Sequence, residues 1–259
     1  MKRIFIVGFP RSGTTFLQSV LMCDERVFSF PETQVFNLGP QRRGIYRFFP
    51  IGLRVGIYCT IWMKKNFGCY KLFLSLNKSK NIKNFFFEIE KLALFNNKSI
   101  LLEKTPGHAR HLKEIRELYP DATIIHLVRN NVNAVSSMSL AAKGWGGDQD
   151  KSSNFKRWLD YLAIAYLDKD QSNTYIIKYE DLLSNLEKKV SLLNSQLDLK
   201  IDTVDVDNKI KENSKLIVNE SESWKVNNLT VGVKKIDQSS KEVDFLPDFC
   251  NFLIDMNKL

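Results

Sequence analysis

Short apolar runs alternate with segments of helical periodicity through most of the chain. Four of these runs have the length of buried strands, and they cover residues 4–7, 99–102, 123–128 and 174–177. Apolar residues recur at helical spacing over residues 15–22, 108–119, 131–140 and 154–168. Strands that alternate with helices form a mostly parallel sheet with helices packed on its faces. We therefore expect an α/β fold with three αβα layers around a mostly parallel central sheet.

The segment between the first predicted helix and the strand at 99–102 differs from the rest of the chain. Helical stretches are expected near 45–76 and 82–95, and large aromatic residues are mixed with cations there. From Thr33 to Phe87 the chain has no Asp or Glu and ten Lys or Arg residues. We expect one domain over residues 1–259, with a helical basic insertion at about 36–96.

The charge of the chain is concentrated in this segment. Among 259 residues there are 38 basic and 29 acidic side chains, so the formal net charge is +9. Without the ten cations of the acid-free segment the balance is 28 to 29, a net charge of −1. The local excess argues against a generally basic protein and favours one anion-facing surface. A nucleic-acid-binding module is disfavoured because the cations are mixed with large apolar residues and no nucleic-acid-binding fold is recognisable. A solvated helical hairpin over the core is the alternative for this segment.

Composition and cysteine spacing exclude several other classes of protein. With 44% hydrophobic and 26% charged residues, the chain has ordinary globular composition. Its four cysteines form no Cys-x-x-Cys pair and do not cluster with the three histidines, so we expect no metal site and reduced thiols. The apolar run at 4–7 is too short for a signal peptide, and Arg47, Pro50 and Arg54 interrupt the run at 45–62. We expect a cytoplasmic protein without a transmembrane helix.

The strongest chemical signal follows the first predicted strand. Residues 8–15 read GFPRSGTT and have the glycine spacing of the phosphate-binding loop G-x-x-x-x-G-K-[ST]. In such a loop, backbone N–H groups and a helix N-terminus bind phosphate oxygens. Thr14 stands where that motif has Lys, which disfavours a nucleoside triphosphate with Mg²⁺. Arg11 is the cation within the loop, and its guanidinium suits phosphate or sulfate oxygens.

The segment 10–15 resembles the 5′-phosphosulfate loop of the sulfotransferases that use 3′-phosphoadenosine-5′-phosphosulfate (PAPS). The resemblance implies a P-loop NTPase-like fold and a 5′-phosphate site formed by Arg11, Ser12, Gly13, Thr14 and Thr15. Arg129 follows the strand at 123–128, and Ser137 comes eight residues later, the spacing that this family uses for the nucleotide's 3′-phosphate. An arginine and a hydroxyl can bind one doubly charged anion from two sides.

Lys104 lies at the end of the strand that begins near residue 99, at the edge where open parallel sheets bind ligands. The resemblance implies a lysine here that contacts the bridging and sulfuryl oxygens and stabilises charge on the departing phosphate. An ordinary surface lysine is the alternative. Cytosolic small-molecule sulfotransferases have Lys-Thr-His at this point, with His as base, whereas this chain has Lys104-Thr105-Pro106. The catalytic base must therefore come from elsewhere.

Glu32 is our candidate for that base. The chain is similar here to protein-tyrosine and carbohydrate sulfotransferases, in which a Glu after the first helix has the base role. A carboxylate beside the acceptor hydroxyl can take its proton as the oxygen attacks sulfur. Helix capping is the alternative role for Glu32, and His108 is the competing base. His111 lies one turn after His108, and His126 is expected to be a core histidine.

Two later segments extend the resemblance. The sequence Tyr179-Glu180-Asp181-Leu182 resembles the family's segment in which a tyrosine approaches the nucleotide. Plain packing of Tyr179 and helix-terminal charge from its acidic neighbours are the alternatives. Ser214 and Trp224-Lys225 loosely resemble the loop that closes over the nucleotide, which implies a phosphate contact from Lys225.

Together these motifs predict an enzyme that transfers a sulfuryl group from PAPS to an acceptor hydroxyl by in-line displacement. Glu32 is the expected base, Lys104 and Arg11 stabilise charge, and no metal takes part. A P-loop nucleotide or small-molecule kinase is the alternative. The basic segment is expected on the acceptor side, where it suits an anionic glycan or, equally, an anionic membrane with a lipid-linked acceptor. No nucleic-acid partner is expected.

Overall fold

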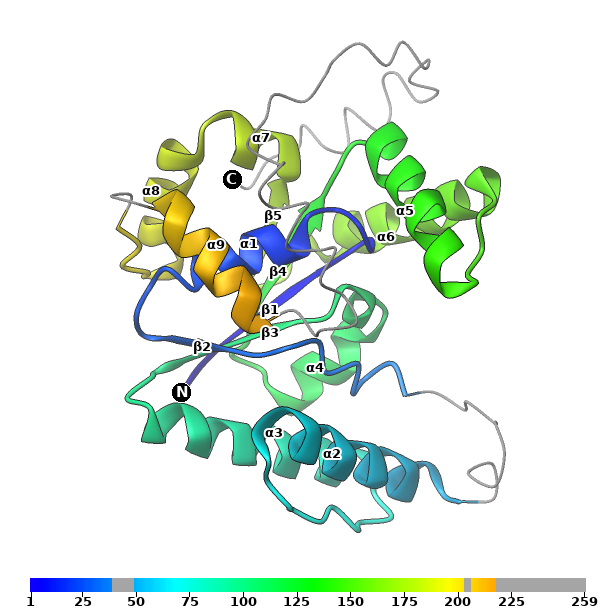
Figure 1. Cartoon of the computed structure of the whole chain (residues 1–259), viewed down its shortest axis with the longest axis vertical. Helices are drawn as coiled ribbons and strands as arrows, with labels where there is room; N and C mark the ends of the chain where they lie inside the picture. Colours follow the sequence, from blue (N-terminus) through cyan, green and yellow to red (C-terminus); the bar gives the residue numbers. More distant parts are fainter. Residues whose placement is uncertain (39–48, 203–205, 218–259) are drawn as a thin grey trace.

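The structure is a computed structural model that describes residues 1–38, 49–202 and 206–217 (Figure 1). Within these residues a sheet of five strands forms the centre, in the order β2-β3-β1-β4-β5. The strands are β1 (Lys2–Gly8), β2 (Val27–Ser29), β3 (Ile100–Lys104), β4 (Thr123–Val128) and β5 (Thr174–Lys178). Every pairing between neighbouring strands is parallel. The expected parallel sheet is therefore confirmed.

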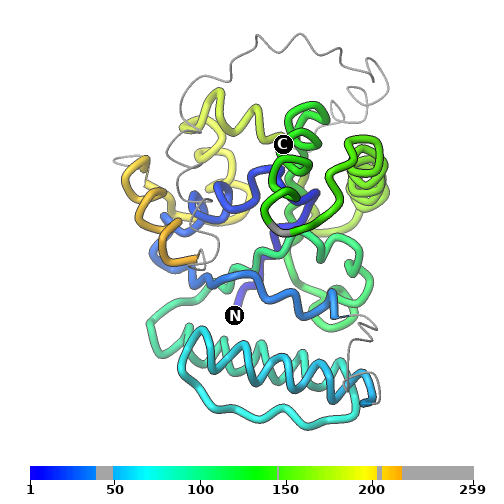
Figure 2. The backbone as a smooth tube through the Cα atoms, turned by 45° about the vertical axis from the view of Figure 1, so that its right-hand side comes forward, coloured from blue at the N-terminus to red at the C-terminus, as the bar shows by residue number. Residues whose placement is uncertain are grey.

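Helices cover both faces of this sheet, because alternate residues of each strand enter two separate cores. In β1, Ile4 and Ile6 pack against α1 (Thr14–Leu21), α7 (Tyr179–Ser184), α8 (Leu186–Leu197) and α9 (Val206–Ile217). Phe5 and Val7 face the opposite core, which contains helices α2 to α6. These are α2 (Ile51–Phe67), α3 (Lys78–Phe95), α4 (Leu112–Leu118), α5 (Asn131–Trp145) and α6 (Lys151–Asp168). The three-layer αβα architecture is thus confirmed, as the tube in Figure 2 also shows.

Several element boundaries differ from those that the sequence pattern predicts. The helix expected over 108–119 is instead a 3-10 turn, Pro106–His111, followed by α4. Gly107 lowers the helix propensity of this turn. Helix α5 continues through Gly144 and ends only at Gly146, which has a left-handed backbone with φ of 68°. The helix is therefore longer than the range 131–140 that the sequence pattern predicts.

Helix α9, at residues 206–217, is not among the helices that the sequence pattern predicts. It buries Val206, Ile210, Ser214 and Ile217, a spacing of three or four residues that the dense polar residues between them disguise. Strand β2 and helices α7 and α8 are also present, although the sequence pattern does not predict them. Within the basic segment, α2 ends at Gly68 and α3 begins after Asn77, so residues 68–77 are not helical. Among the described helices, none has the length and apolar character needed to cross a bilayer.

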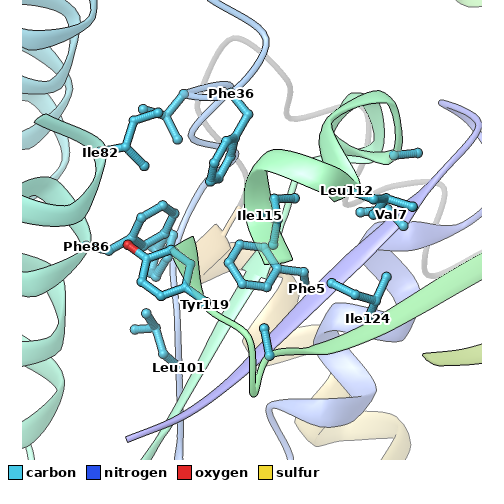
Figure 3. Close-up of a cluster of buried hydrophobic side chains, with 14 of the residues drawn as sticks. Phe5, Val7, Phe36, Ile82, Phe86, Leu101, Leu112, Ile115, Tyr119 and Ile124 are labelled. Atoms are coloured by element: carbon cyan, nitrogen blue, oxygen red, sulfur yellow. The ribbon is translucent and has the colours of Figure 1, made fainter. Parts of the chain in front are cut away.

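Aromatic packing joins α3 and α4 to the middle of the sheet (Figure 3). The ring of Phe5 on β1 lies against Phe36, Phe86 and Tyr119, with ring centroids 6.0–6.4 Å apart. Phe36 also packs on Phe86 at 6.1 Å. The cluster therefore fixes the segment that follows β2 against α3 as well as against the sheet.

We predict that Phe5→Ala lowers the free energy of unfolding by about 3–5 kcal/mol, because it leaves a cavity among the rings of Phe36, Phe86 and Tyr119. Urea denaturation followed by circular dichroism measures this change. Phe95→Ala is the matched control, since Phe95 is 86% exposed at the end of α3, and it should change stability by less than about 0.5 kcal/mol. Equal losses in the two variants would contradict the central role of the Phe5 cluster.

Candidate functional site

The candidate site lies along the carboxyl edge of the sheet, to which every strand contributes one chemical group. In sheet order, the groups are Glu32 after β2, Lys104 at the end of β3, the loop 9–13 after β1, Arg129 after β4 and Tyr179 after β5. Parallel strands have all their carboxyl ends at the same edge, which is where open α/β sheets bind ligands. The sheet therefore brings together residues that lie up to 170 positions apart, from Phe9 to Tyr179.

The loop between β1 and α1 has the backbone of an anion-binding turn. Gly8 and Gly13 have φ of 150° and 91°, and Arg11 has φ of 77°. A Cβ atom on Gly8 would lie 2.4 Å from the carbonyl oxygen of Leu127, and one on Gly13 would lie 2.3 Å from the ring of Tyr179. These two positions require glycine because both the backbone angle and the space exclude a side chain.

This loop leaves hydrogen-bond donors for a ligand. Gly13 is the N-cap of α1 and provides no side-chain cap, so the first N–H groups of the helix have no cap from that residue. Among the described side chains, Ser12 Oγ is buried without a hydrogen-bond partner, and so is Nε of Arg129. Both residues border one small cavity beside the loop. A buried donor without a partner is unfavourable, so these atoms fit a site built for an anion such as phosphate.

Arg129, Ser137 and Arg11 lie together at the β4 side of the loop. Nη1 of Arg129 donates to the backbone oxygen of Arg11 at 3.0 Å, and Nε of Arg11 donates to Oγ of Ser137 at 3.1 Å. The guanidinium of Arg129 also stacks on the ring of Tyr179, 4.6 Å from its centroid. The structure thus brings Arg129 and Ser137 into contact with Arg11, and guanidinium and hydroxyl groups of this kind can bind a doubly charged phosphate.

Glu180 orients the start of α5 next to this cluster. Its Oε1 accepts a hydrogen bond from the backbone N–H of Asn130 at 3.0 Å, and the Asn130 side chain caps α5. The residue after Arg129 is therefore tied to the strand end that carries Tyr179. This link was not among the roles expected for Glu180.

Lys104 and Glu32 form an ion pair at the β3 side of the loop. Nζ of Lys104 lies 2.6 Å from Oε1 of Glu32, and the side chains are 3% and 21% exposed. Gln34 donates to the other carboxylate oxygen at 2.8 Å. Within the described residues the next helix after Glu32 begins at Ile51, so Glu32 caps none of the described helices. The pair places a proton acceptor and a cation side by side, close to solvent.

Helix α2 holds the backbone around Glu32. Nε1 of Trp62 donates to the Glu32 carbonyl at 3.1 Å, and the Tyr58 hydroxyl donates to the Thr33 carbonyl at 2.6 Å. Burial, with smaller contributions from Cys59, Glu103 and Glu32, raises the pKa of Tyr58 to about 12, so this hydroxyl remains a donor. The sequence analysis did not single out Tyr58 or Trp62 as contacts of Glu32.

A buried carboxylate, that of Glu103, also holds the segment that contains Glu32 and Thr33. Its Oε1 accepts from the hydroxyls of Thr33 and Thr105 at 2.9 and 2.6 Å, and its Oε2 lies 3.1 Å from Nδ1 of His108. Burial raises the pKa of Glu103, but His108 and the two hydroxyls outweigh burial, and the net pKa is lowered. Glu103 belongs to none of the motifs identified in the sequence, although an acidic residue inside the apolar strand next to Lys104 is a visible signal.

The three histidines lie away from the Lys104–Glu32 pair or are buried. His108 is buried, and its Nε2 accepts from the backbone N–H of Phe36 at 3.4 Å, so both of its ring nitrogens have partners. His126 is buried and contacts Asp168 at 2.9 Å, as expected of a core histidine. His111 lies 3.8 Å from Glu114 on α4. This arrangement favours Glu32 over His108 as the group that meets an acceptor.

The structure describes only one of the three predicted residues from the C-terminal part of the chain. Ser214 is buried on α9 and donates to the Lys211 carbonyl, so it packs within that helix. Trp224 and Lys225 lie outside the described residues. Among the described residues, no group of three or more His, Cys, Asp or Glu side chains is placed to hold a metal ion.

Comparison with known proteins assigns the chain to a family. A family model described as "Sulfotransferase family" matches residues 3–203. Among curated protein sequences, none matches the chain.

Solved structures share the fold. The sulfotransferase domain of the Synechococcus PCC 7002 olefin synthase superposes with a TM-score of 0.60 at 15% identity, covering 98% of this chain and 94% of that domain. The sulfotransferase domain from the curacin biosynthetic pathway gives 0.54 at 18% identity, covering 82% and 77%. A sulfotransferase from Alicyclobacillus acidocaldarius gives 0.50 at 15% identity, covering 90% and 96%. At 15–18% sequence identity, these similarities show a shared fold alone.

We predict that Glu103→Gln lowers the free energy of unfolding at pH 7 by roughly 3 kcal/mol, because a buried, ionised acceptor of three hydrogen bonds is lost. The pKa of Glu103 is lowered in the folded protein, so its stabilising effect is complete above the ordinary value of 4.5 and declines as the pH falls through the folded pKa. The stability difference between the two proteins should therefore shrink on acidification below about pH 4.5.

Urea denaturation at a series of pH values measures this difference. Glu117→Gln is the control, because it removes the same charge from an exposed position of α4 and should show no such pH dependence. A pH-independent difference for Glu103→Gln would contradict an ionised carboxylate at the centre of the network.

Proposed function

Because the chain belongs to the sulfotransferase family, we propose that it transfers a sulfuryl group from PAPS to the hydroxyl of an acceptor. The observation that most supports this proposal is the Lys104–Glu32 pair beside a loop with unused anion-binding donors. An ammonium and a carboxylate at one point can stabilise a leaving oxygen and accept a proton in the same step.

The loop residues would hold the 5′-phosphate of the donor. These residues are Arg11, Ser12, Gly13, Thr14 and Thr15, and their support is the positive-φ backbone, the uncapped start of α1 and the unpartnered hydroxyl of Ser12. Arg129 and Ser137 would hold the 3′-phosphate, since their side chains converge on Arg11. Tyr179 would face the nucleotide on the far side of Arg129.

When bound, PAPS supplies the activated sulfuryl group, and the protein supplies position and charge. Glu32 would accept the proton of the acceptor hydroxyl as that oxygen forms its bond to sulfur and the bond from sulfur to the phosphate oxygen breaks. Lys104 and Arg11 would neutralise the negative charge that develops on the departing phosphate, and the products would be a sulfate ester and adenosine 3′,5′-bisphosphate. No role for a metal is proposed. Catalysis of this kind rests on positioning and electrostatics.

The acceptor would approach from the side of α2. We take residues 1–259 as one sulfotransferase domain in which the segment 36–96 forms the acceptor side. The contacts from Trp62 and Tyr58 to the backbone around Glu32 support this placement. Arg42 and Arg43, which belong to the same basic segment, lie outside the described residues. The cytoplasmic location stays a prediction.

The kinase alternative is not favoured. Thr14 replaces the lysine of the nucleotide-triphosphate loop, and β4 is followed by Arg129 where a Mg²⁺-binding aspartate would be needed.

We predict that the protein binds adenosine 3′,5′-bisphosphate and that Arg129→Ala weakens this binding by about 10- to 100-fold, because a charge-assisted phosphate contact is lost. Calorimetric titration measures the affinity, with ATP and Mg²⁺ as the competing ligand. Arg110→Ala, at an exposed arginine of the 3-10 turn, should bind the bisphosphate like the unmodified protein. Tighter binding of ATP with Mg²⁺, or binding of neither nucleotide, would contradict the PAPS site.

We predict that Glu32→Gln lowers kcat by about 10²- to 10⁴-fold and leaves the affinity for adenosine 3′,5′-bisphosphate nearly unchanged. Glutamine keeps an oxygen for Lys104 and removes only the proton acceptor. The release of the bisphosphate from PAPS in the presence of phenolic, sugar and lipid alcohols measures the rate. Glu25→Gln, at an exposed glutamate, is the control. An equal loss of nucleotide affinity would remove Glu32 from the role of base.

A further inference from the structure

An extended segment returns along α2 and connects it to α3. We call residues 68–77 the strap. It begins at Gly68, whose left-handed backbone ends α2, and it ends at Asn77, whose side chain caps α3. The carbonyl of Phe73 lies over Gly56 and that of Leu76 over Gly52, so the strap runs opposite to α2. In Figures 1 and 2 it forms the outer edge of the molecule, on the side of α2 and α3 away from the sheet.

The structure holds this strap in one orientation. The N–H of Phe73 donates to Oγ1 of Thr60 at 3.3 Å, and the side chain of Asn81 bonds to both the N–H and the carbonyl of Ser75, at 3.1 and 2.8 Å. Glycine at positions 52 and 56 allows the backbones to touch, because a Cβ atom there would lie 1.9 Å from a strap carbonyl. The backbone of the strap, and with it the outward face, is therefore held in a fixed conformation.

That outward face is a row of apolar side chains. Phe73 is buried and packs on Phe85, whereas its neighbours on alternate positions point outward. The exposed fractions are 75% for Tyr70, 66% for Leu72, 65% for Leu74 and 68% for Leu76. A contiguous apolar row on a fixed backbone marks an interaction surface, unlike a single exposed leucine.

Lysines surround this row. Lys64 and Lys65 are exposed at the end of α2 where the strap begins, Lys71 lies within it, and Lys80 is exposed just after it. Nζ of Lys64 lies 4.8 Å from the centre of the Tyr70 ring. The sequence has no Asp or Glu between residues 33 and 87, although Lys71 pairs with Glu88 of α3. The partner of the surface must therefore be apolar at the centre and negative at the rim.

We propose that the strap and its lysines bind the surface of an anionic lipid bilayer. Leucines that project from the outer edge can enter the acyl region while lysines contact anionic headgroups. A glycan is less favoured, because it has no aliphatic region into which three leucine side chains could insert. A protein partner is less favoured, because protein interfaces are depleted in Lys and their central contacts are seldom Leu.

Lipid binding would also orient the candidate site. One side of α2 contacts the strap through Gly52, Gly56 and Thr60, and the same helix contacts the Glu32 segment through Tyr58 and Trp62. Glu32 would then lie about 10 Å from the lipid surface, which is the diameter of one helix. An acceptor anchored in the bilayer would suit this distance. That consequence rests on the proposed sulfuryl transfer, whereas lipid binding itself does not.

Co-sedimentation of the full-length protein with vesicles tests the proposal. We expect binding to vesicles of equimolar phosphatidylcholine and phosphatidylserine, much weaker binding to pure phosphatidylcholine, and a decrease with added salt. The triple variant Leu72→Ser, Leu74→Ser, Leu76→Ser should lose at least about tenfold in affinity. The variant Lys64→Gln, Lys65→Gln, Lys80→Gln should lose about fivefold for each lysine replaced.

The matched control is Leu140→Ser, Leu167→Ser, Leu216→Ser, which removes three equally exposed leucines from α5, α6 and α9. It should bind vesicles like the unmodified protein. Both leucine variants should keep their affinity for adenosine 3′,5′-bisphosphate, which separates this test from that of the proposed function. Equal vesicle binding by the two leucine variants, or no vesicle binding at all, would overturn the proposal. So would self-association in analytical ultracentrifugation that only the strap variant loses, since the strap would then bind a second copy of the chain.

Discussion

Parallel pairing of β1 with both β3 and β4 is the constraint on which the fold and the candidate site depend. Because all five strands run in one direction, the chain must leave each of them at the same edge. The order of the strands then sets the order of the chemistry. Glu32 and Lys104 lie to one side of the loop after β1, and Arg129 and Tyr179 lie to the other. The proposed acceptor and nucleotide sides are thus separated by the strand order.

Much of this arrangement could be predicted from the sequence, because its signals are local. Buried parallel strands are short apolar runs, so β4 was predicted with its observed limits, and the loop at 8–15 shows its glycines directly. The spacing of Arg129 and Ser137 also identified these two residues as a pair, and in the structure both contact Arg11. Whether they bind a phosphate stays a prediction.

The remaining features depend on contacts between distant segments, which no local pattern contains. Strand β2 has three residues and exists because β3 pairs with it. The link between Glu103 and Thr33 spans 70 positions, and the link between Trp62 and Glu32 spans 30. The strap was expected to be helical, since its leucines and aromatic residues satisfy a helical pattern as well as an alternating one. Gly68 and the close approach of Gly52 and Gly56 decide between the two.

Two neighbouring residues of β3 show how the same strand end supports both stability and the proposed chemistry. Glu103 is buried and stays ionised because His108 and two hydroxyls surround it, so its charge is fixed. Glu32 instead reaches solvent and shares its charge with Lys104. If an anionic donor engages the ammonium of Lys104, the carboxylate of Glu32 gives up part of this contact and can accept a hydrogen bond from an acceptor hydroxyl instead. Under the proposed reaction, the Lys104–Glu32 pair would therefore make the base available when the donor is in place, while Glu103 keeps the segment that carries the base where it is.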